Sequence, residues 1–269
     1  MINSTEFARR MRVHILDMIY SAKASHIGSA LSCTDIVAVL YNNILKIESD
    51  DPHRFKNRDR IVFSKGHASA SLYAALALAG FFPEEELATF YKNGSKLSGH
   101  VSHKVPGVEF STGSLGHGLS VAVGMALAAK KRGEAWRSFA ILSDGECDEG
   151  STWEAALFAN QFKLDNLLLI IDYNKIQSLD YTKMVLDLEP FEAKWKSFGW
   201  ESISVDGHNH KELHRALSSC PINKGSPSVI IAHTVKGKGI SFMEDKVLWH
   251  YRCPDEEEYK RAVQELKGV

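Results

Sequence analysis

Five short runs of apolar and β-branched residues recur along the chain, and each run ends in polar or glycine-rich sequence. Several runs are continuously apolar instead of alternating with polar residues, which is typical of strands buried on both faces of a parallel sheet. The pattern therefore predicts five strands. They lie at residues 60–66, 138–145, 166–174, 201–207 and 227–234.

Stretches with helical periodicity lie between these strands. Strands that alternate with helices predict an α/β fold with a doubly wound, mostly parallel sheet flanked by helices. The first twenty residues read as an amphipathic helix, and residues 255–268 read as a charged surface helix. The other helices are expected at residues 68–80, 118–133, 151–162 and 210–220.

Two segments, residues 94–117 and 235–255, contain glycine and histidine but show little periodicity. Loops of that length in a compact domain are usually functional or mobile. The chain has no internal repeat and no linker rich in Pro and Ser, so we expect residues 1–269 to form a single domain.

Composition and charge exclude several classes of protein. The 269 residues carry 32 Lys and Arg against 33 Asp and Glu, and no long basic run indicates a nucleic-acid partner. No apolar run approaches the roughly 20 residues that cross a bilayer, and the N-terminus lacks a signal-peptide pattern. The four cysteines form no CxxC pair. A cytoplasmic protein without membrane association is expected.

Four acidic residues crowd into LSDGECDEGS, residues 142–151, where the second predicted strand ends. Asp-Gly is a common turn signal, and acids before a helix are favoured by the helix dipole. A calcium-binding EF-hand loop that begins at Asp144 is excluded, because Glu149 stands at the glycine position and Ala155 at the final glutamate position.

A ligand site is the other interpretation of this stretch. A right-handed βαβ crossover places Asp144 and Asn174 at the carboxyl ends of neighbouring strands, the edge where doubly wound sheets bind ligands. Both side chains offer the hard oxygen ligands that Mg²⁺ prefers, together with substrate phosphates. Gly145 allows a phosphate to approach the backbone closely, and the following helix N-terminus favours negative charge.

The segment from Ser143 to Ile176 resembles the thiamine diphosphate motif, in which G-D-G is followed about thirty residues later by N-x-[IV]. More specifically, it is similar to the diphosphate-binding part of transketolase, and the similarity covers nearly the whole chain. The resemblance implies that Asp144, Asn174 and the carbonyl of Ile176 bind Mg²⁺, or Ca²⁺ or Mn²⁺ in its place. Ser143 replaces the first Gly, which the fold should tolerate if its φ is negative.

Other segments carry the same resemblance: SHIGS, SKGHASAS, STGSLGHG and DKVLWH. They imply that His26, His100 and His250 line the substrate channel and that His67 lies near the cofactor diphosphate. These four are the candidate catalytic residues, because neutral imidazoles orient hydroxyls and transfer protons near neutral pH. The implied cofactor-binding set is His67, Gly113, Ser114, Leu115, Asp144, Gly145, Glu146, Glu149, Asn174 and Ile176.

Two acids of the stretch keep a second interpretation. Glu149 matches a family carboxylate at the dimer interface between two cofactors, yet it is equally typical of an acid stabilised by a helix dipole. Glu146, although included in the cofactor-binding set, is also typical of a helix-entry acid, as is Asp148. Lys236 begins a KGKG run that is no P-loop, and we interpret it as a flexible gate or a phosphate neighbour.

Three residues depart from the family pattern. Ile27 replaces a usual Pro, His117 a common Gln, and Tyr251 a small residue, and these departures suggest a reshaped substrate channel. The remaining histidines lie in charged or helical sequence. His14, His53, His210 and His214 are predicted to be ordinary surface or hydrogen-bonded residues, and His103 and His208 are left undecided.

In the family, a second domain supplies the glutamate that activates the cofactor's aminopyrimidine ring. This chain ends at Val269, after the first domain, so we expect the N-terminal subunit of a split transketolase. A C-terminal subunit would complete the site in an α2β2 heterotetramer, which transfers a two-carbon ketol unit from a ketose or ketose phosphate to an aldose. The alternatives are a deoxyxylulose-phosphate-synthase-like carboligase, a 2-oxo-acid dehydrogenase α-subunit or a non-catalytic paralogue.

Overall fold

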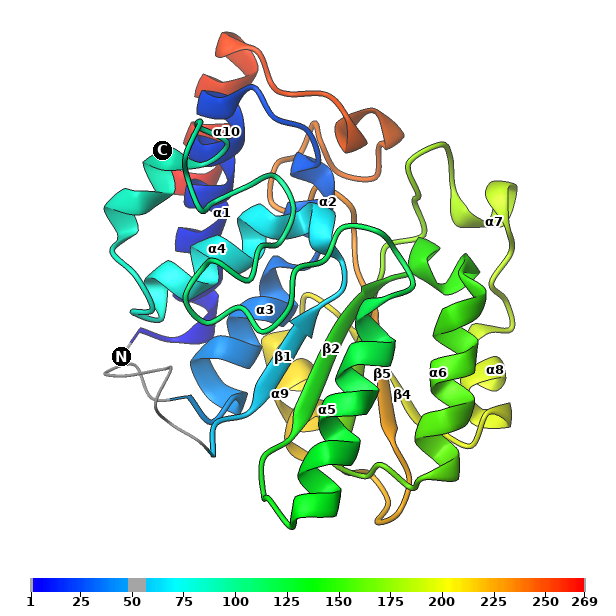
Figure 1. Ribbon diagram of the computed structural model, residues 1–269. Coiled ribbons are helices and arrows are strands. Elements are labelled where there is room, and N and C mark those ends of the chain that lie inside the picture. The colour runs from blue at the N-terminus through cyan, green and yellow to red at the C-terminus, as the bar shows by residue number, and fades with distance from the viewer. Residues whose placement is uncertain (1, 48–56, 269) are drawn as a thin grey trace.

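The computed structural model describes residues 2–47 and 57–268 of the chain. Within them, five parallel strands form one sheet in the order β1-β2-β3-β5-β4 (Figure 1). This confirms the predicted parallel sheet, and each strand is slightly shorter than predicted. The strands are β1 (Arg60–Phe63), β2 (Ser138–Ser143), β3 (Leu167–Tyr173), β4 (Glu201–Asp206) and β5 (Ser228–His233).

The central strands are apolar on both sides because the sheet separates two hydrophobic cores. In β2, Phe139 and Ile141 belong to one core, while Ala140 and Leu142 belong to the other. All six residues of β2 and all seven of β3 are buried. The continuously apolar runs of the sequence are therefore explained by burial on both faces.

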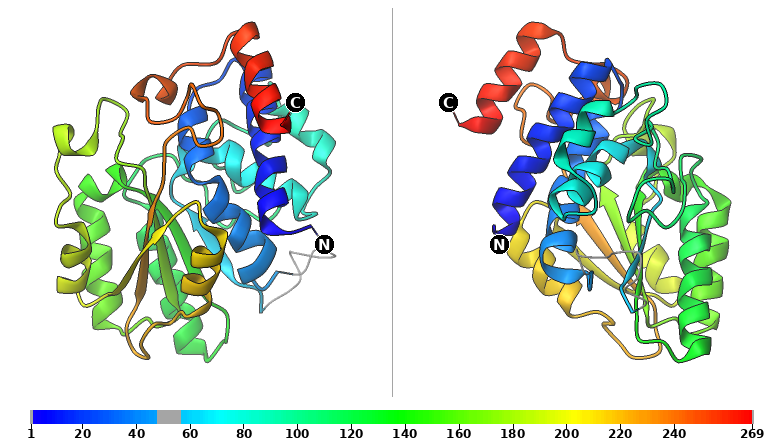
Figure 2. Two further views of the ribbon diagram at one scale, coloured as in Figure 1. Left: turned by 180° about the vertical axis from the view of Figure 1, so that it is seen from behind. Right: turned by 60° about the vertical axis from the view of Figure 1, so that its left-hand side comes forward.

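Helices cover both faces of the sheet (Figures 1 and 2). One core is formed with α1 (Ser4–Ala22), α2 (Ile27–Ser32), α3 (Thr34–Val39), α4 (Ser69–Leu78), α9 (His210–Ser218) and α10 (Glu256–Lys267). The other core is formed with α5 (Gly118–Arg132), α6 (Gly150–Gln161) and α8 (Phe191–Ser197). The terminal helices α1 and α10 lie side by side.

All six predicted helices are present, but α2, α3 and α8 were not predicted. Every residue of α2 and α3 is buried, so neither helix has the polar face that gives an amphipathic pattern. The short α7 (Thr182–Val185) lies in the connection after β3. No helix in the described part of the chain is both long enough and apolar enough to cross a membrane.

The sheet gathers its loops at one edge. Strands β2 and β3 are parallel neighbours, with Ser143 opposite Asp172, so Asp144 and Asn174 follow adjacent strand ends as predicted. Ser143 itself is the last residue of β2 and is not among the residues with positive φ, which meets the condition for replacing Gly. The long loops 94–117 and 235–255 contain no strand, and the latter contains several turns and one short 3₁₀ helix, Val247–His250.

Candidate active site

A cavity of about 230 Å³ opens at the carboxyl edge of the sheet. Ten of the thirteen residues that the sequence predicted for the site line this cavity, whereas Ser114, Glu146 and Glu149 do not. The lining also contains residues outside that prediction, among them two lysines. The cavity is lined by His26, Ser29, Lys65, His67, His100, Gly113, Leu115, Ser143, Asp144, Gly145, Asn174, Ile176, Gln177, Ser178, Lys236, His250 and Tyr251.

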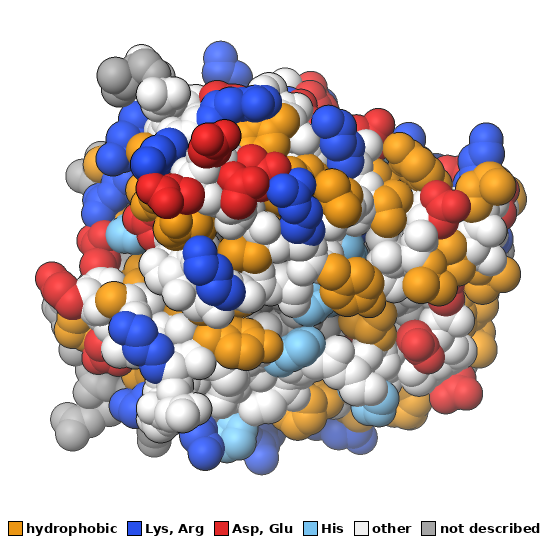
Figure 3. Space-filling view, turned by 90° about the horizontal axis from the view of Figure 1, so that it is seen from above, with side chains coloured by type: hydrophobic (Ala, Val, Ile, Leu, Met, Phe, Trp, Pro, Cys, Tyr) orange, Lys and Arg blue, Asp and Glu red, His pale blue; other side chains and the backbone are white. Residues whose placement is uncertain are grey.

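The four candidate histidines come from four separate loops and converge on the cavity. The ring centroid of His26 lies 5.4 Å from that of His67, 5.9 Å from that of His100 and 5.1 Å from that of His250. Figure 3 shows histidine side chains at the centre of this face. His26 adopts a positive φ of 74° before α2, and its N–H donates to the carbonyl of His250 at 2.7 Å.

Burial keeps three of these imidazoles neutral. It lowers the pKa of His26 to about 4, with the neighbouring His100 and Lys236 adding to the effect. Burial and Lys236 lower the pKa of His250 to about 3. Burial and the ammonium of Lys65 hold the pKa of His67 well below its ordinary value. At neutral pH each ring therefore has one N–H donor and one acceptor nitrogen for a ligand.

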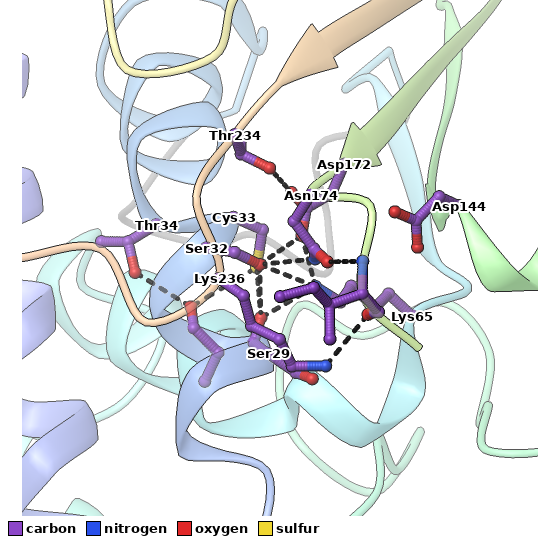
Figure 4. A network of polar contacts seen from close by, with 12 residues as sticks. Ser29, Ser32, Cys33, Thr34, Lys65, Asp144, Asp172, Asn174, Thr234 and Lys236 are labelled. Atoms are coloured by element: carbon purple, nitrogen blue, oxygen red, sulfur yellow. Dashed lines mark hydrogen bonds and ion pairs between the residues drawn. The ribbon is translucent and has the colours of Figure 1, made fainter. Parts of the chain in front are cut away.

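Asp144 is a buried carboxyl group with no cationic partner among the described residues. One carboxyl oxygen accepts from the N–H of Gly145 at 2.7 Å and the other from the N–H of Lys175 at 2.6 Å. Burial, and then the charge of Asp172, raise its pKa to about 7. In Figure 4 it lies apart from the neighbouring polar network. A bound cation would offset this cost of burial.

A buried ion pair forms the next part of the wall (Figure 4). The ammonium of Lys65 donates to the carboxylate of Asp172, to the carbonyl of Ser29 at 2.8 Å and to the hydroxyl of Ser32 at 3.0 Å. The hydroxyls of Ser32, at 2.5 Å, and of Thr234 also donate to Asp172. Burial opposes the charge of Asp172, but Lys65 and these donors outweigh it and lower the pKa of Asp172.

Lys236 brings a second ammonium group into the cavity. Its Nζ donates to the carbonyl of Ile176 at 3.0 Å and lies 2.8 Å from Nδ1 of His250. Burial and the nearby Lys65 lower its pKa to about 7. The interpretation of the KGKG run as a flexible gate stays untested, but Lys236 does lie in the wall.

The oxygen atoms near Asp144 suit a hard divalent cation. Oδ1 of Asn174 accepts from the N–H of Ile176 at 3.0 Å, and Ile176 lines the same cavity, where its carbonyl accepts from Lys236. No cluster of three His, Cys, Asp or Glu residues that could hold a metal occurs in the described ranges. One carboxylate, one amide and one carbonyl oxygen nevertheless match Mg²⁺, which keeps water and phosphate oxygens in its remaining positions.

Glu146 is not a helix-entry acid on the surface, and the structure corrects this interpretation. Its side chain is completely buried beneath the cavity and accepts hydrogen bonds from the N–H of Gly116 at 2.9 Å and from the hydroxyl of Ser64. Burial raises its pKa to about 7. Glu149, by contrast, is exposed immediately before α6, and Asp148 accepts from the amide of Gln177 at 2.7 Å.

The three departures from the family pattern occupy different places. Ile27 is fully buried in the hydrophobic core and does not line the cavity, so its side chain is no part of the channel wall, and its effect on the channel stays a prediction. His117 is exposed outside the cavity, with Nδ1 2.9 Å from the carbonyl of Leu115. Tyr251 lines the mouth, where its ring centroid lies 4.7 Å from that of His250.

The other histidines are structural or exposed. His14 lies 2.9 Å from Glu84, which confirms the prediction of a hydrogen-bonded residue. His210 lies 3.0 Å from the carboxylate of Asp35, and His208 contacts the same carboxylate at 2.7 Å. His53 falls outside the described residues. His103 lies 2.7 Å from the hydroxyl of Ser111, and His214 is exposed on α9.

Comparison with known proteins extends these findings. A family model described as "Transketolase, thiamine diphosphate binding domain" matches residues 3–266. The chain is 42% identical over 259 residues to one subunit of the apulose-4-phosphate transketolase of Phocaeicola vulgatus, covering 96% of this chain and 92% of that protein. It is 43% identical to SqwG, a 6-deoxy-6-sulfo-D-fructose transketolase subunit of a Clostridium species, covering 97% of this chain and 94% of SqwG.

Longer relatives and solved structures agree with this match. Human transketolase is 39% identical over 96% of this chain, which spans 41% of the human protein. The crystal structure of transketolase from Campylobacter jejuni superposes with a TM-score of 0.92 at 34% identity, over 98% of this chain and 42% of that protein. The chain therefore spans about two fifths of the length of these relatives.

Proposed function

This chain belongs to the transketolase family, as its thiamine diphosphate-binding part, and we propose that it is the cofactor-binding subunit of a two-subunit transketolase. The reaction is transfer of a two-carbon ketol unit from a ketose or ketose phosphate to an aldose acceptor. The observation that carries the proposal is the convergence of four imidazoles with Asp144, Asn174 and Ile176 on one cavity. Relatives of similar length are named as single subunits of transketolases.

We propose that Asp144, Asn174 and the carbonyl of Ile176 bind the divalent cation, Mg²⁺ or in its place Ca²⁺ or Mn²⁺. The thiamine diphosphate would supply carbanion chemistry as an electron sink. His67 offers a ring nitrogen to its diphosphate, Lys65 offers a nearby positive charge, although its three N–H groups already donate within the chain, and Gly145 offers a backbone without a side chain. A Cβ at Gly145 would already lie 3.0 Å from the side chain of Gln177, so glycine preserves the room for the ligand.

The histidines serve the sugar substrate in this proposal. Because the pKa values of His26 and His250 lie near 4 and 3, both rings are neutral at pH 7 and can donate to or accept from hydroxyl groups. His100 lies at the exposed rim, where it can contact the substrate hydroxyls first. Proton transfer to and from these hydroxyls is their proposed chemical role.

A partner protein is supported by exposed apolar side chains outside the cavity. Leu157 and Phe158 on α6 and Phe162 just after it are exposed, and the rings of Phe158 and Phe162 pack with their centroids 4.4 Å apart. In the connection after β3, Leu179 and Met184 are more exposed still, at 77% and 68%. Exposed groups of this kind mark interaction sites. We propose that a C-terminal subunit covers them, supplies the glutamate for the aminopyrimidine ring and forms an α2β2 heterotetramer.

The other interpretations of the sequence receive less support. The relatives described above are transketolases, which favours this family over a deoxyxylulose-phosphate-synthase-like carboligase or a 2-oxo-acid dehydrogenase α-subunit. The four histidines, Asp144 and Asn174 all line the cavity, which argues against a non-catalytic paralogue. A single diphosphate-binding domain over residues 1–269, a cytoplasmic location and the interface role of Glu149 stay predictions.

Reconstitution tests the proposal. We expect the chain alone to show no ketol transfer, and to gain it when mixed with the candidate C-terminal subunit encoded beside it, Mg²⁺ and thiamine diphosphate. Donors should include simple ketose phosphates and, because relatives are named for them, apulose 4-phosphate and 6-deoxy-6-sulfofructose. Turnover by the single chain, or no turnover by the mixture with any of these donors, would contradict the proposal.

A further inference from the structure

One buried carboxyl group connects three loops of the cavity. Glu146 lies in the turn after β2, two residues beyond Asp144, and its side chain has no solvent exposure. Its Oε1 accepts from the N–H of Gly116 at 2.9 Å and from the hydroxyl of Ser64. That hydroxyl in turn accepts from the N–H of Gly118 at 3.1 Å, the first residue of α5.

Each connected loop carries part of the cavity wall. The loop after β1 continues from Ser64 directly into Lys65 and His67, which both line the cavity. The loop before α5 places Gly113 and Leu115 in the wall immediately ahead of the tethered glycine. The turn that contains the carboxyl group itself carries the proposed cation ligand. One acceptor atom therefore links three parts of the cavity wall.

The packing around this acceptor leaves little freedom. Gly116 has a φ of 81°, and a Cβ there would lie 2.6 Å from the hydroxyl oxygen of Ser151 and 2.7 Å from the Cβ of Glu149. Its carbonyl accepts from the hydroxyl of Ser151 at 2.7 Å, so the turn after β2 holds this glycine by its N–H and the first turn of α6 holds it by its C=O. A Cβ at Gly118 would overlap the hydroxyl of Ser64.

A role confined to helix α6 does not account for these contacts. Both donors to the carboxyl group belong to other loops, and the residue that caps the start of α6 is Glu149, whose side chain makes no capping hydrogen bond. The second oxygen, Oε2 of Glu146, is buried without a hydrogen-bond partner among the described residues. A solvated helix-entry acid would have neither property.

We propose that Glu146 is a positioning residue of the cofactor cavity, which holds the loops after β1 and before α5 in register with the turn after β2. It acts through the wall residues and does not itself contact the ligand. The identity of the ligand as thiamine diphosphate rests on the proposed function, whereas the tether between the loops rests on the contacts within the chain.

Three variants separate this role from a general effect on stability. Glu146→Leu keeps the approximate size of the side chain but removes the acceptor, and Glu146→Gln keeps an acceptor oxygen for Gly116 and Ser64. Glu257→Gln makes the same chemical change on the exposed side of α10 and serves as the control. If Glu146→Leu does not fold, Ser64→Ala tests the same tether, because it removes the bonds of Ser64 to Glu146 and Gly118 and keeps the bond from Gly116 to Glu146.

The first readout is amide hydrogen exchange of the chain without cofactor. In Glu146→Leu we expect residues 64–67 and 113–118 to exchange about tenfold faster, because buried donors lose their acceptor, while α1 and α10 exchange as in the wild type. Glu146→Gln and Glu257→Gln should change this exchange by no more than about threefold. Equal acceleration throughout the chain, or equal damage by Gln and Leu, would overturn the positioning role.

The second readout is the dissociation constant of thiamine diphosphate for the assembled protein with Mg²⁺. It should rise about tenfold in Glu146→Leu and remain within about threefold of wild type in Glu146→Gln. Unchanged affinity in Glu146→Leu would overturn the inference. A wild-type assembly that binds no thiamine diphosphate, with the exchange result as expected, would overturn the proposed function but leave the tether intact.

Discussion

Asp35 and Asp144 are both buried acids, with 4% and 1% of their surfaces exposed, but their surroundings differ. Asp35 lies on α3. Arg12 of α1 donates to both its oxygens, at 3.0 and 2.6 Å, and His208 and His210 also contact it. Burial opposes its charge, but these partners outweigh the opposition and hold its pKa well below the ordinary value. Asp144 has only backbone N–H donors, and its pKa is raised to about 7.

Asp172 shows that location alone does not cause this difference. It lies at the same sheet edge as Asp144, yet Lys65 supplies a buried cation and its pKa is lowered. Of these three carboxylates, Asp35 and Asp172 have cationic partners within the fold, and Asp144 has none. Glu146 also lacks a cation, but unlike Asp144 it does not line the cavity. The contrast supports the proposal that Asp144 binds a ligand with positive charge.

The largest effect on stability is expected at Asp172. Asp172→Ala leaves the ammonium of Lys65 buried without its counter-ion, and breaking such a pair costs about 3–5 kcal/mol of the free energy of unfolding. Urea denaturation of the cofactor-free chain measures this loss. Adding Lys65→Met to the variant should recover part of it, since the unpaired charge is then gone. No recovery would show that the pair is not the source of the stability.

A smaller effect, which depends on pH, is expected at Asp35. Asp35→Asn should lower the free energy of unfolding by about 1–3 kcal/mol at pH 7, because Arg12, His208 and His210 lose a charged acceptor. A carboxyl whose folded pKa is lowered stabilises the protein fully above its unfolded value of 3.8, and this stabilisation declines as the pH falls from that value toward the lower folded pKa. The difference between wild type and variant should therefore shrink below about pH 4. A constant difference would contradict this account.

The smallest effect is expected at Glu84, a half-exposed carboxylate. It pairs with Arg10 at 2.8 Å and with His14 at 2.9 Å, but both partners reach solvent. Glu84→Gln should change the free energy of unfolding by less than about 1 kcal/mol, and added salt should remove the difference. A loss as large as that at Asp35 would show that burial does not separate these carboxylates.

The sequence predicts the sheet and the positions of Asp144 and Asn174 because both follow from local patterns. Apolar runs locate the strands, and the handedness of βαβ crossovers brings Asp144 and Asn174 to one edge. The convergence of the four histidines was expected only from the resemblance to transketolase, since they come from loops without periodicity. Their roles stay predictions.

The rest of the site could not be predicted because it depends on distant partners. Lys65 is buried only because Asp172, 107 residues later, lies beside it. An acid before a helix resembles a solvated residue in the sequence, and only the contacts from Ser64 and Gly116 show that Glu146 is enclosed. The burial of Ile27 was equally hidden, because α2 is buried on every side and has no amphipathic pattern.

The claim that Asp144 awaits a cation is tested most directly by calorimetric titration of thiamine diphosphate into the chain assembled with its partner. We expect wild type to bind with Mg²⁺ and not with a chelator, and Asp144→Asn to lose about 100-fold or more in affinity. The same variant should change the free energy of unfolding by less than about 2 kcal/mol when cofactor is absent, because removal of a buried charge offsets the loss of one acceptor for a backbone N–H. Unchanged affinity in a folded Asp144→Asn, or equally tight wild-type binding in chelator, would contradict the account.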